Sequence, residues 1–474
     1  MIVTGNRGAP VSLPNTFEPT ALDVRTRSLL DGPIAATLLR LAWPNVLVML
    51  AQACTGLIET WWVSRLGTEA LAGMALVFPV VMLVQMISAG AMGGGISSAV
   101  ARALGAGRRD QADALVLHAI VVNLALGIFF SAVMLCFGPQ IYRALGGSDG
   151  ELNTALSYSN VVFAGNVLLW GMNALASVIR GTGNMFVPSM VICAGVVFLV
   201  PLSPCLIFGV GPFPELGVAG AGLALVLFYA AGTSVLLWYI LSGRNAARLR
   251  PTHLEWRMFH DILAVGVTAA VTSTQTNLTI ALATSLVASA AGADAVAGYG
   301  TAVRLEYLLV PLVFGLGAPL VALVGTNIGA GQRERALRIA LIGGAMAFGI
   351  SEAIGLVAAF WPQAWLSLFS PDSSVIQTGS AYLRTVGPAY GFFGLGMALY
   401  FASQGAARLF WPMLAGCVRI VIAIGGGWLA YYATGSLTGL FVALGLGLFV
   451  YGAMLVIAIQ SGAWFRPGLS EIKG

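Results

Sequence analysis

Charged residues are scarce in this chain, and their scarcity excludes an ordinary water-soluble fold. Asp, Glu, Lys and Arg make up 9% of the 474 residues, whereas 58% are hydrophobic. Soluble domains carry about 25% charged residues. Because a membrane-spanning helix needs about 20 mostly apolar residues, the composition predicts an all-α integral membrane protein surrounded by a lipid bilayer.

The chain also lacks the motifs of several enzyme and binding-protein classes. Its five cysteines show no metal-binding spacing such as Cys-x-x-Cys, and because all lie in apolar runs we expect buried structural thiols. The glycines of 105–107 and 329–331 are not followed by Gly-Lys-Ser/Thr, so they predict tight turns and no phosphate loop. No nucleophilic triad is visible. We therefore expect a protein that is not an enzyme and holds no cofactor or metal.

Twelve apolar segments follow one another along the chain and predict its domain organisation. They lie at about 36–64, 71–104, 113–137, 154–180, 187–209, 217–241, 260–289, 295–326, 337–361, 376–404, 411–433 and 438–463. The predicted domains are a tail at 1–33, an N-lobe at 34–241, a linker at 242–259, a C-lobe at 260–463 and a second tail at 464–474.

The basic residues indicate how the spans are oriented. The net charge is +5, and Lys473 is the single lysine. Most basic residues fall in the tails and in loops on one side of the twelve spans, so we interpret them as topology signals and predict no nucleic-acid partner. By the positive-inside rule, both termini are cytoplasmic. We expect a monomeric, multi-pass protein of the plasma (inner) membrane of a bacterium.

The two halves of the chain carry an internal repeat. Residues 105–112 (GAGRRDQA) align with residues 329–336 (GAGQRERA) at an offset of 224, and the same offset places Gly181 on Gly405. An offset of 225 places Gly67 on Gly292, in a third loop. The repeat predicts two pseudo-symmetric six-helix bundles of like topology, related by an axis along the membrane normal.

The order and duplication of several short motifs resemble the multidrug and toxic compound extrusion (MATE) family over roughly residues 34–463. The motifs are GLIET at 56–60, ALGAG at 103–107, IRGTGN at 179–184, RLE at 304–306 and VGTNIGAG at 324–331. The resemblance implies an antiporter that exports small, cationic, amphipathic organic compounds in exchange for H⁺ or Na⁺ by alternating access. A flippase or organic-anion exporter on a related two-lobe fold is the alternative.

Glu59 is the leading candidate for the ion-coupling residue. Asn45, Gln52 and Glu59 are seven residues apart on the first span, so they lie close to one helix face. A charge facing lipid near the bilayer centre costs about 2.5 kcal/mol or more, so this stripe predicts contact with protein or a cavity. The resemblance implies an acidic residue, usually Asp, at the position of Glu59, and often Gln at that of Gln52. A structural carboxylate is the alternative.

Further polar residues of the predicted N-lobe bear on the choice of ion. Asn166 and Asn173 are seven apart on the fourth span, and they either line the same cavity or hydrogen-bond between helices. Ser203 is the one polar side chain in residues 198–204, where the resemblance implies Asn or Asp. Because hard cations prefer several oxygen ligands, this composition favours H⁺ over Na⁺.

The predicted C-lobe has a different polar content. Gln275 and Asn277 belong to a polar stretch at 272–277 on the seventh span, which predicts a cavity wall. Arg304 and Glu306 lie two residues apart on the eighth span, so they do not face each other and should have different partners. They either bind substrate or ion, or pair structurally.

The repeat places an uncharged residue where the N-lobe has Glu59. Its repeat position in the second half holds Ala283 or Thr284. We therefore expect ion coupling mainly in the N-lobe. The C-lobe would supply a neutral polar wall and an Arg304/Glu306 element, with Arg419 as a candidate partner.

Overall fold

Helices form the secondary structure throughout the computed structural model, which describes residues 24–147 and 149–465. The first half contains α1 (Val24–Asp31), α2 (Ile34–Ser64), α3 (Thr68–Gln85), the π-helix η1 (Met86–Met92), α4 (Gly93–Gly105), α5 (Arg109–Ala144), α6 (Asp149–Ala164), α7 (Asn166–Gly181), α8 (Phe186–Phe208) and α9 (Val218–Leu241). The second half contains α10 (Trp256–Gly329), α11 (Arg333–Phe360), α12 (Pro362–Leu366), α13 (Ser373–Val386), the 3₁₀ helix η2 (Gly387–Ala389), α14 (Tyr390–Gly405), α15 (Phe410–Ile420), the π-helix η3 (Val421–Gly426), α16 (Gly427–Thr434) and α17 (Leu437–Gln460).

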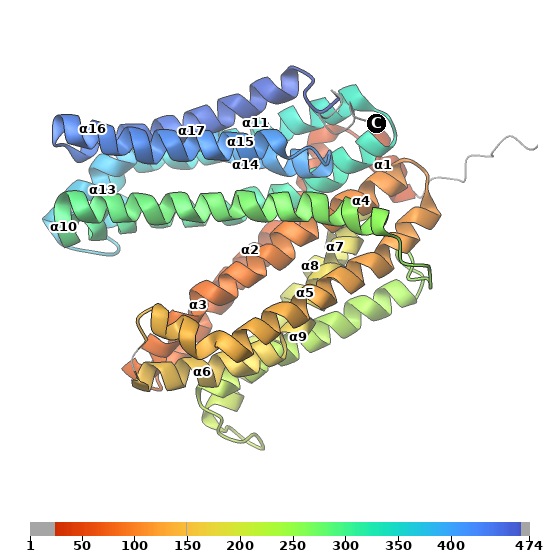
Figure 1. The fold of residues 1–474 in the computed structure, drawn as a ribbon, viewed down its shortest axis with the longest axis horizontal. Coiled ribbons are helices and arrows are strands. Elements are labelled where there is room, and N and C mark those ends of the chain that lie inside the picture. Colours follow the sequence, from red (N-terminus) through yellow and green to blue (C-terminus); the bar gives the residue numbers. More distant parts are fainter. Residues whose placement is uncertain (1–23, 148, 466–474) are drawn as a thin grey trace, which may run out of the picture.

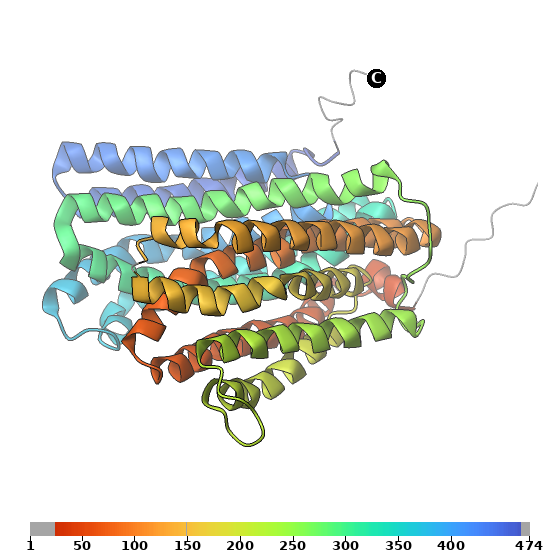
Figure 2. The ribbon, with the colours of Figure 1, turned by 60° about the horizontal axis from the view of Figure 1, so that its bottom comes forward.

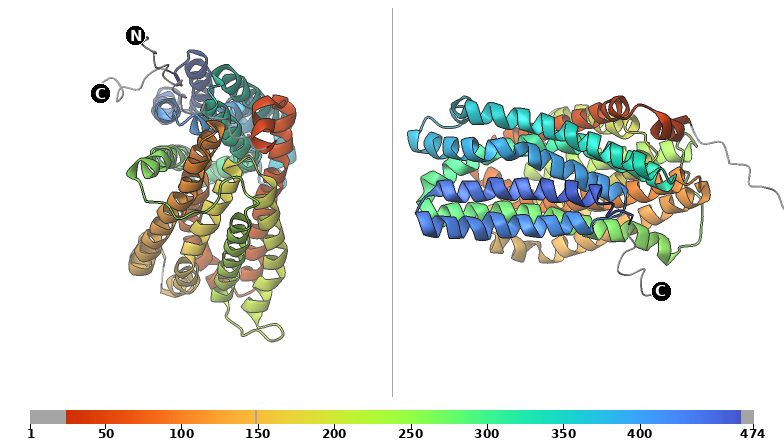
Figure 3. Two further views of the ribbon diagram at one scale, coloured as in Figure 1. Left: turned by 90° about the vertical axis from the view of Figure 1, so that its right-hand side faces the viewer. Right: turned by 90° about the horizontal axis from the view of Figure 1, so that it is seen from above.

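Each predicted apolar segment coincides with a helix or with consecutive helices. Within the described residues, nine helices are long and apolar enough to span a membrane, or ten if the bent pair α6 and α7 counts as one span. The first half of α10 does not qualify, because its polar stretch at 272–277 lowers the hydropathy. The helices run largely along the long axis of the molecule (Figures 2 and 3).

Glycines at repeat-related positions adopt the same unusual backbone conformation. Gly67, before α3, has a φ of 111°, and its counterpart Gly292 interrupts α10 with a φ of 77°. Gly107 and Gly331, which end the two GAG turns, have φ values of 71° and 76°. Positive φ favours glycine because it has no Cβ. These positions are therefore turns that both halves of the chain need, and the GAG motifs are tight turns as predicted.

The hydrophobic side chains form two principal cores. One draws its buried residues from Val48 to Ile262, and the other chiefly from Val265 to Trp464. We call α2–α9 the N-lobe and α10–α17 the C-lobe. Leu38, near the start of α2, joins the second core, so this helix packs against both lobes. Figure 1 shows the lobes meeting at the end that holds α1, called the α1 end below, and running apart towards the opposite end.

Two repeat-related glycines allow the lobes to meet closely at the α1 end. A Cβ on Gly105 of α4 would lie 2.0 Å from the carbonyl oxygen of Thr326 on α10. A Cβ on Gly329 of α10 would lie 2.1 Å from the carbonyl oxygen of Arg102 on α4. Because real Cβ atoms do not approach a backbone oxygen so closely, only glycine permits this crossing. The lobes therefore meet through a pseudo-symmetric pair of contacts.

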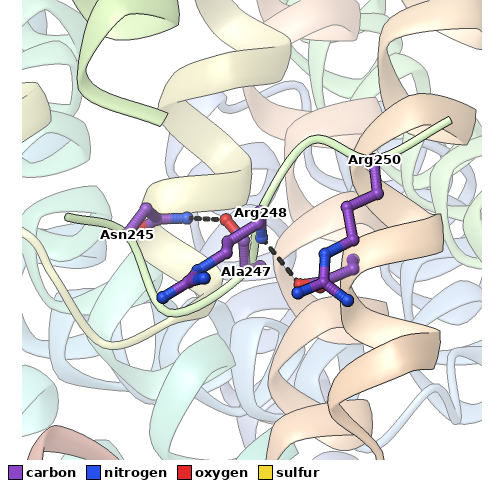
Figure 4. Close-up of polar contacts among 5 residues, drawn as sticks. Asn245, Ala247, Arg248 and Arg250 are labelled. Carbon is purple, nitrogen blue, oxygen red and sulfur yellow. Dashed lines mark hydrogen bonds and ion pairs between the residues drawn. The ribbon is translucent and has the colours of Figure 1, made fainter. Parts of the chain in front are cut away.

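The segment between α9 and α10 is attached to the N-lobe. Asp113 of α5 accepts a hydrogen bond from the backbone N–H of Arg248 at 2.7 Å and forms an ion pair with Nε of Arg250 at 3.3 Å. Asn245 donates to the carbonyl oxygen of Ala247 at 2.7 Å, which shapes the same turn (Figure 4). The segment predicted as a linker is therefore attached to α5 through Arg248 and Arg250, and α10 begins within it at Trp256.

Part of the predicted tail, residues 24–31, is the helix α1, whose buried face is formed by Thr26, Leu29 and Leu30. The remaining tail residues 1–23 and 466–474 lie outside the described part.

The expectation that the cysteines are buried is wrong. All five are free thiols, but Cys54, Cys136 and Cys417 are exposed, and Cys193 and Cys205 are intermediate. An apolar span has a lipid-facing side, so apolar surroundings in sequence do not imply burial.

Candidate functional site

Glu59 lies at a cavity within the N-lobe. The cavity measures about 120 Å³, and its lining comes from α2, α3, α6, α8 and α9. Its residues are Gln52, Thr55, Gly56, Glu59, Thr60, Met74, Phe78, Val81, Met82, Gln85, Tyr158, Val196, Leu199, Leu225, Phe228 and Tyr229. Gln52 and Glu59 share this cavity because they stand seven residues apart on α2, so both point to the same side of it.

The lining combines one carboxylate with neutral polar groups and aromatic rings. Glu59 is the single charged side chain among the lining residues. Its Oε1 atom is buried, and no residue in the described part of the chain donates a hydrogen bond to it. Gln52 and Gln85 contribute amides, and Tyr158 and Tyr229 contribute hydroxyl groups. A carboxylate without a fixed partner in such surroundings is suited to a proton or a cationic guest.

The other three predicted N-lobe amides do not line this cavity. Asn45 is buried against α8, where it accepts a hydrogen bond from Ser189 at 3.5 Å. Asn166, at the break between α6 and α7, donates to the carbonyl oxygen of Gly127 on α5 at 3.1 Å. Asn173 donates to Ser88 of η1 at 3.1 Å. These placements favour the interhelical alternative for Asn166 and Asn173, and Asn45 likewise contacts a neighbouring helix.

Ser203 is also absent from the cavity lining. Its side chain is fully buried on α8, and its hydroxyl has no hydrogen-bond partner among the described residues. The nearby cavity residue on this helix is Leu199. The fifth span thus contributes apolar surface to the cavity and no ion ligand.

Gln85 and Tyr229 are polar members of the cavity that were not predicted from the sequence. Gln85 ends α3 directly before the π-helix η1, and π-helical turns occur often at functional sites. Tyr229 lies in α9, in an otherwise apolar run. An isolated polar residue in a span was the available signal for both. Their approach to Glu59 depends on how helices distant in sequence pack together.

The C-lobe holds a smaller cavity around Glu306. It measures about 20 Å³, which is room for one water molecule. Tyr382 of α13 donates a hydrogen bond from its hydroxyl to Glu306. Arg419 of α15 lines the same cavity and lies over the rings of Phe393 and Tyr451, 5.8 Å from each centroid. Glu306 and Arg419 are therefore neighbours at one cavity, as predicted, and the ion pairs found among the described residues do not include one between them.

Arg304 is separate from this cluster. It is exposed, and its guanidinium lies 5.5 Å from the centroid of the Phe369 ring. The expectation that Arg304 and Glu306 have different partners is therefore confirmed.

The two amides predicted on the seventh span also lie elsewhere. Gln275 donates to Sγ of Cys417 on α15 at 3.0 Å, and Asn277 is exposed and lies near Met86 of the N-lobe. Neither amide lines the two cavities described above.

The oxygen atoms of the N-lobe cavity bear on which ion it could hold. Glu59 is its one carboxylate, and the other oxygens belong to amides and hydroxyls. Within residues 24–147 and 149–465, no group of three or more His, Cys, Asp or Glu side chains could hold a metal ion. The cavity therefore offers an ion one carboxylate together with neutral amide and hydroxyl oxygens.

Comparison with known protein families agrees with the repeat. The MatE family profile matches residues 44–205 and again residues 269–429. The two matches begin 225 residues apart, at 44 and 269, which is the spacing of the internal repeat. The chain belongs to the MatE family. Members of this family are transporters, and the all-helical, two-lobe fold of this MatE protein agrees with that class.

Individual relatives and solved structures support the assignment. The "FAD transporter" of Shewanella oneidensis is 30% identical over 383 residues, covering 79% of this chain and 82% of that protein. The "Probable multidrug resistance protein NorM" of Deinococcus radiodurans is 28% identical over 442 residues, covering 88% and 93%. A crystal structure of MATE in the bent conformation has a TM-score of 0.86 at 23% identity, covering 93% of this chain and 98% of that one. The structural likeness shows that the fold is shared.

Proposed function

We propose that this MatE protein is a secondary active antiporter that exports small, cationic, amphipathic organic compounds in exchange for H⁺, with Na⁺ as the second candidate ion. The observation that carries the proposal is the N-lobe cavity, in which Glu59 is the single charged lining residue. A carboxylate attracts a cation or a proton, and the rings of Phe78, Phe228 and Tyr158 offer faces for the apolar part of a substrate. Substrate and proton would compete for Glu59.

Alternating access would couple this competition to movement of the lobes. Lobes that meet at one end and run apart towards the other form one of the two states that such a mechanism needs (Figure 1). In the second state the contacts of Gly105 and Gly329 would open. The distribution of arginine residues supports an orientation with the α1 end in the cytoplasm of a bacterial cell and the protein in its plasma membrane. We propose that one chain is sufficient, since each chain contains both lobes.

Export of an organic anion is the second candidate function. The Shewanella oneidensis relative is named a FAD transporter, and FAD carries an anionic diphosphate. The N-lobe cavity has no basic lining residue, which disfavours an anion there. Arg419 of the C-lobe cavity is the one cation lining either cavity, and it shares that cavity with Glu306. The observed charges therefore favour the cation.

Substrate choice can be tested in vesicles that contain the purified protein. A fluorescent organic cation and FAD would each be followed under an imposed pH gradient and, separately, an imposed Na⁺ gradient. We expect the pH gradient to drive accumulation of the cation, and neither gradient to drive FAD. Accumulation of FAD without accumulation of the cation would contradict the proposal and support the organic-anion alternative.

A further inference from the structure

Helix α1 lies where the N-lobe and the C-lobe meet. Its buried residues Thr26, Leu29 and Leu30 share one face, because residues three and four apart are neighbours on a helix. Arg25 and Arg27 on the other side are exposed. One face of α1 is therefore docked against the protein, and the rest of the helix, apart from the exposed Val24, is polar.

The docked face contacts the N-lobe through Leu29. The side chain of Leu29 lies against the turn that follows α7, where Gly183 has a φ of 81°. A Cβ on Gly183 would lie 2.6 Å from Cδ1 of Leu29. Gly183 therefore leaves the space that Leu29 occupies, and this side chain is fitted to the N-lobe turn.

The same segment is held by two side chains of the C-lobe. Asn327 of α10 donates from Nδ2 to the carbonyl oxygen of Leu29 at 3.2 Å. Arg335 of α11 donates to the carbonyl oxygen of Gly32, directly after α1. Asn327 is completely buried and lies beside Thr326, whose carbonyl oxygen faces Gly105 in the contact between the lobes. Residue Leu29 thus touches both lobes at the point where they meet.

We propose that α1 is a latch that stabilises the conformation in which the lobes are closed at the α1 end. If the lobes separate there, Gly183 and Asn327 move apart, and Leu29 must lose its contact with at least one of them. Release of α1 is then a required step of opening at this end. This proposal rests on the two-state movement proposed above. It concerns the populations of the states that are open and closed at the α1 end, and not the substrate or the coupling ion.

The latch can be tested by measuring the separation of the lobes directly. In a variant without the five native cysteines, Asp110→Cys and Glu334→Cys would carry spin labels at the exposed, repeat-related starts of α5 and α11. Pulsed electron paramagnetic resonance in lipid nanodiscs then reports the distance across the α1 end. Leu29→Ala removes the apolar contact, and Asn327→Ala removes the hydrogen bond to the carbonyl oxygen of Leu29. Val24→Ala is the matched control, because Val24 lies on the same helix and is 82% exposed.

The latch predicts that Leu29→Ala and Asn327→Ala each raise the ratio of open to closed protein by about tenfold, which corresponds to ~1.4 kcal/mol. The Val24→Ala control should keep the distribution of the labelled parent. Distributions that stay unchanged in either of the two test variants would overturn the proposal. Unfolding temperature and elution volume confirm that each variant is folded. Because the distances are measured without substrate or ion gradient, a failure of the latch is distinguishable from a failure of the transport proposal.

Discussion

At the scale of single residues, the two intramembrane carboxylates with cavities have different surroundings. Glu306 accepts a hydrogen bond from Tyr382 and shares its cavity with Arg419. Glu59 has a buried oxygen without a hydrogen-bond donor in the described part of the chain, and its cavity holds no basic residue. Glu306 is thus satisfied by the protein itself, whereas Glu59 is available to a proton or a substrate.

This contrast predicts a structural role for Glu306. Tyr382→Phe removes the hydroxyl that donates to Glu306, and leaving a buried acceptor unsatisfied costs about 1–3 kcal/mol. We expect a lower unfolding temperature in detergent, while transport still responds to the ion gradient. Glu306→Gln should behave in the same way, because its amide oxygen still accepts from Tyr382 but Arg419 loses the nearby negative charge. Loss of the gradient response in Glu306→Gln at an unchanged unfolding temperature would contradict the structural role.

The sequence predicted only part of the site at this scale. The heptad spacing placed Gln52 and Glu59 together, because that relation lies within one helix. Asn45 has the same spacing but contacts α8 and does not line the cavity. Gln85, Tyr158 and Tyr229 lie on other helices than Glu59, and they line the same cavity only because those helices pack together. A single sequence does not specify which helices pack together.

At the scale of helices, the crossing of α4 and α10 depends on glycine. Gly105→Ala would place a Cβ 2.0 Å from a backbone carbonyl oxygen, which cannot move away as a flexible side chain could. We expect Gly105→Ala to weaken closure of the lobes at the α1 end and to reduce transport. Gly349→Ala in α11 is the control, because its Cβ would meet no atom within 4 Å. Equal transport rates in the two variants, measured in vesicles, would show that the close crossing is not required.

The first turn of α13 offers a test of a helix cap outside the spans. Asp372 accepts hydrogen bonds from the backbone N–H and the hydroxyl of Ser374, both at 2.8 Å. These bonds, chiefly the one from the backbone N–H, lower the pKa of Asp372 below its ordinary value. A lowered pKa in the folded state means that the cap stabilises above the unfolded pKa of about 3.9 and is lost as pH falls through the folded pKa.

We therefore expect the amide of Ser374 to exchange slowly at neutral pH and to lose protection only as the pH falls through the lowered pKa of Asp372, which lies below its unfolded value of about 3.9. Asp372→Ala should remove that protection at every pH, because alanine is a poor N-cap. Hydrogen–deuterium exchange of the peptide that contains the first turn of α13 measures both effects. Protection that is equal in Asp372→Ala and the unmodified protein would contradict the assigned cap.

The helices themselves were largely predictable, because span length and hydropathy are properties of local sequence. The break in α10 at Gly292 followed from its repeat relation to Gly67. Helix α1 was missed, because its eight residues contain three buried side chains among charged neighbours, and the surface against which they pack exists only after both lobes have folded. The cysteines were wrongly expected to be buried for a related reason, since local hydropathy does not distinguish an exposed side of a span from a buried one.

At the scale of the whole molecule, the scaffold is symmetric and its chemistry is not. The paired contacts of Gly105 and Gly329 follow the repeat, as do the positive-φ glycines. The two cavities differ, because no described residue donates a hydrogen bond to Oε1 of Glu59 in the N-lobe, whereas the C-lobe cavity has Glu306 together with Arg419. The central claim is that a duplicated frame carries ion coupling in one lobe, at Glu59.

The most direct test of this claim is gradient-driven transport by Glu59→Gln in reconstituted vesicles. Glutamine preserves the shape of the side chain but cannot release or take up a proton near neutral pH, so we expect transport of the organic cation to lose its response to an imposed pH gradient. Glu306→Gln is the matched control from the other lobe and should keep that response. Gradient-driven rates in Glu59→Gln equal to those of the unmodified protein, at equal amounts of folded protein, would contradict the account.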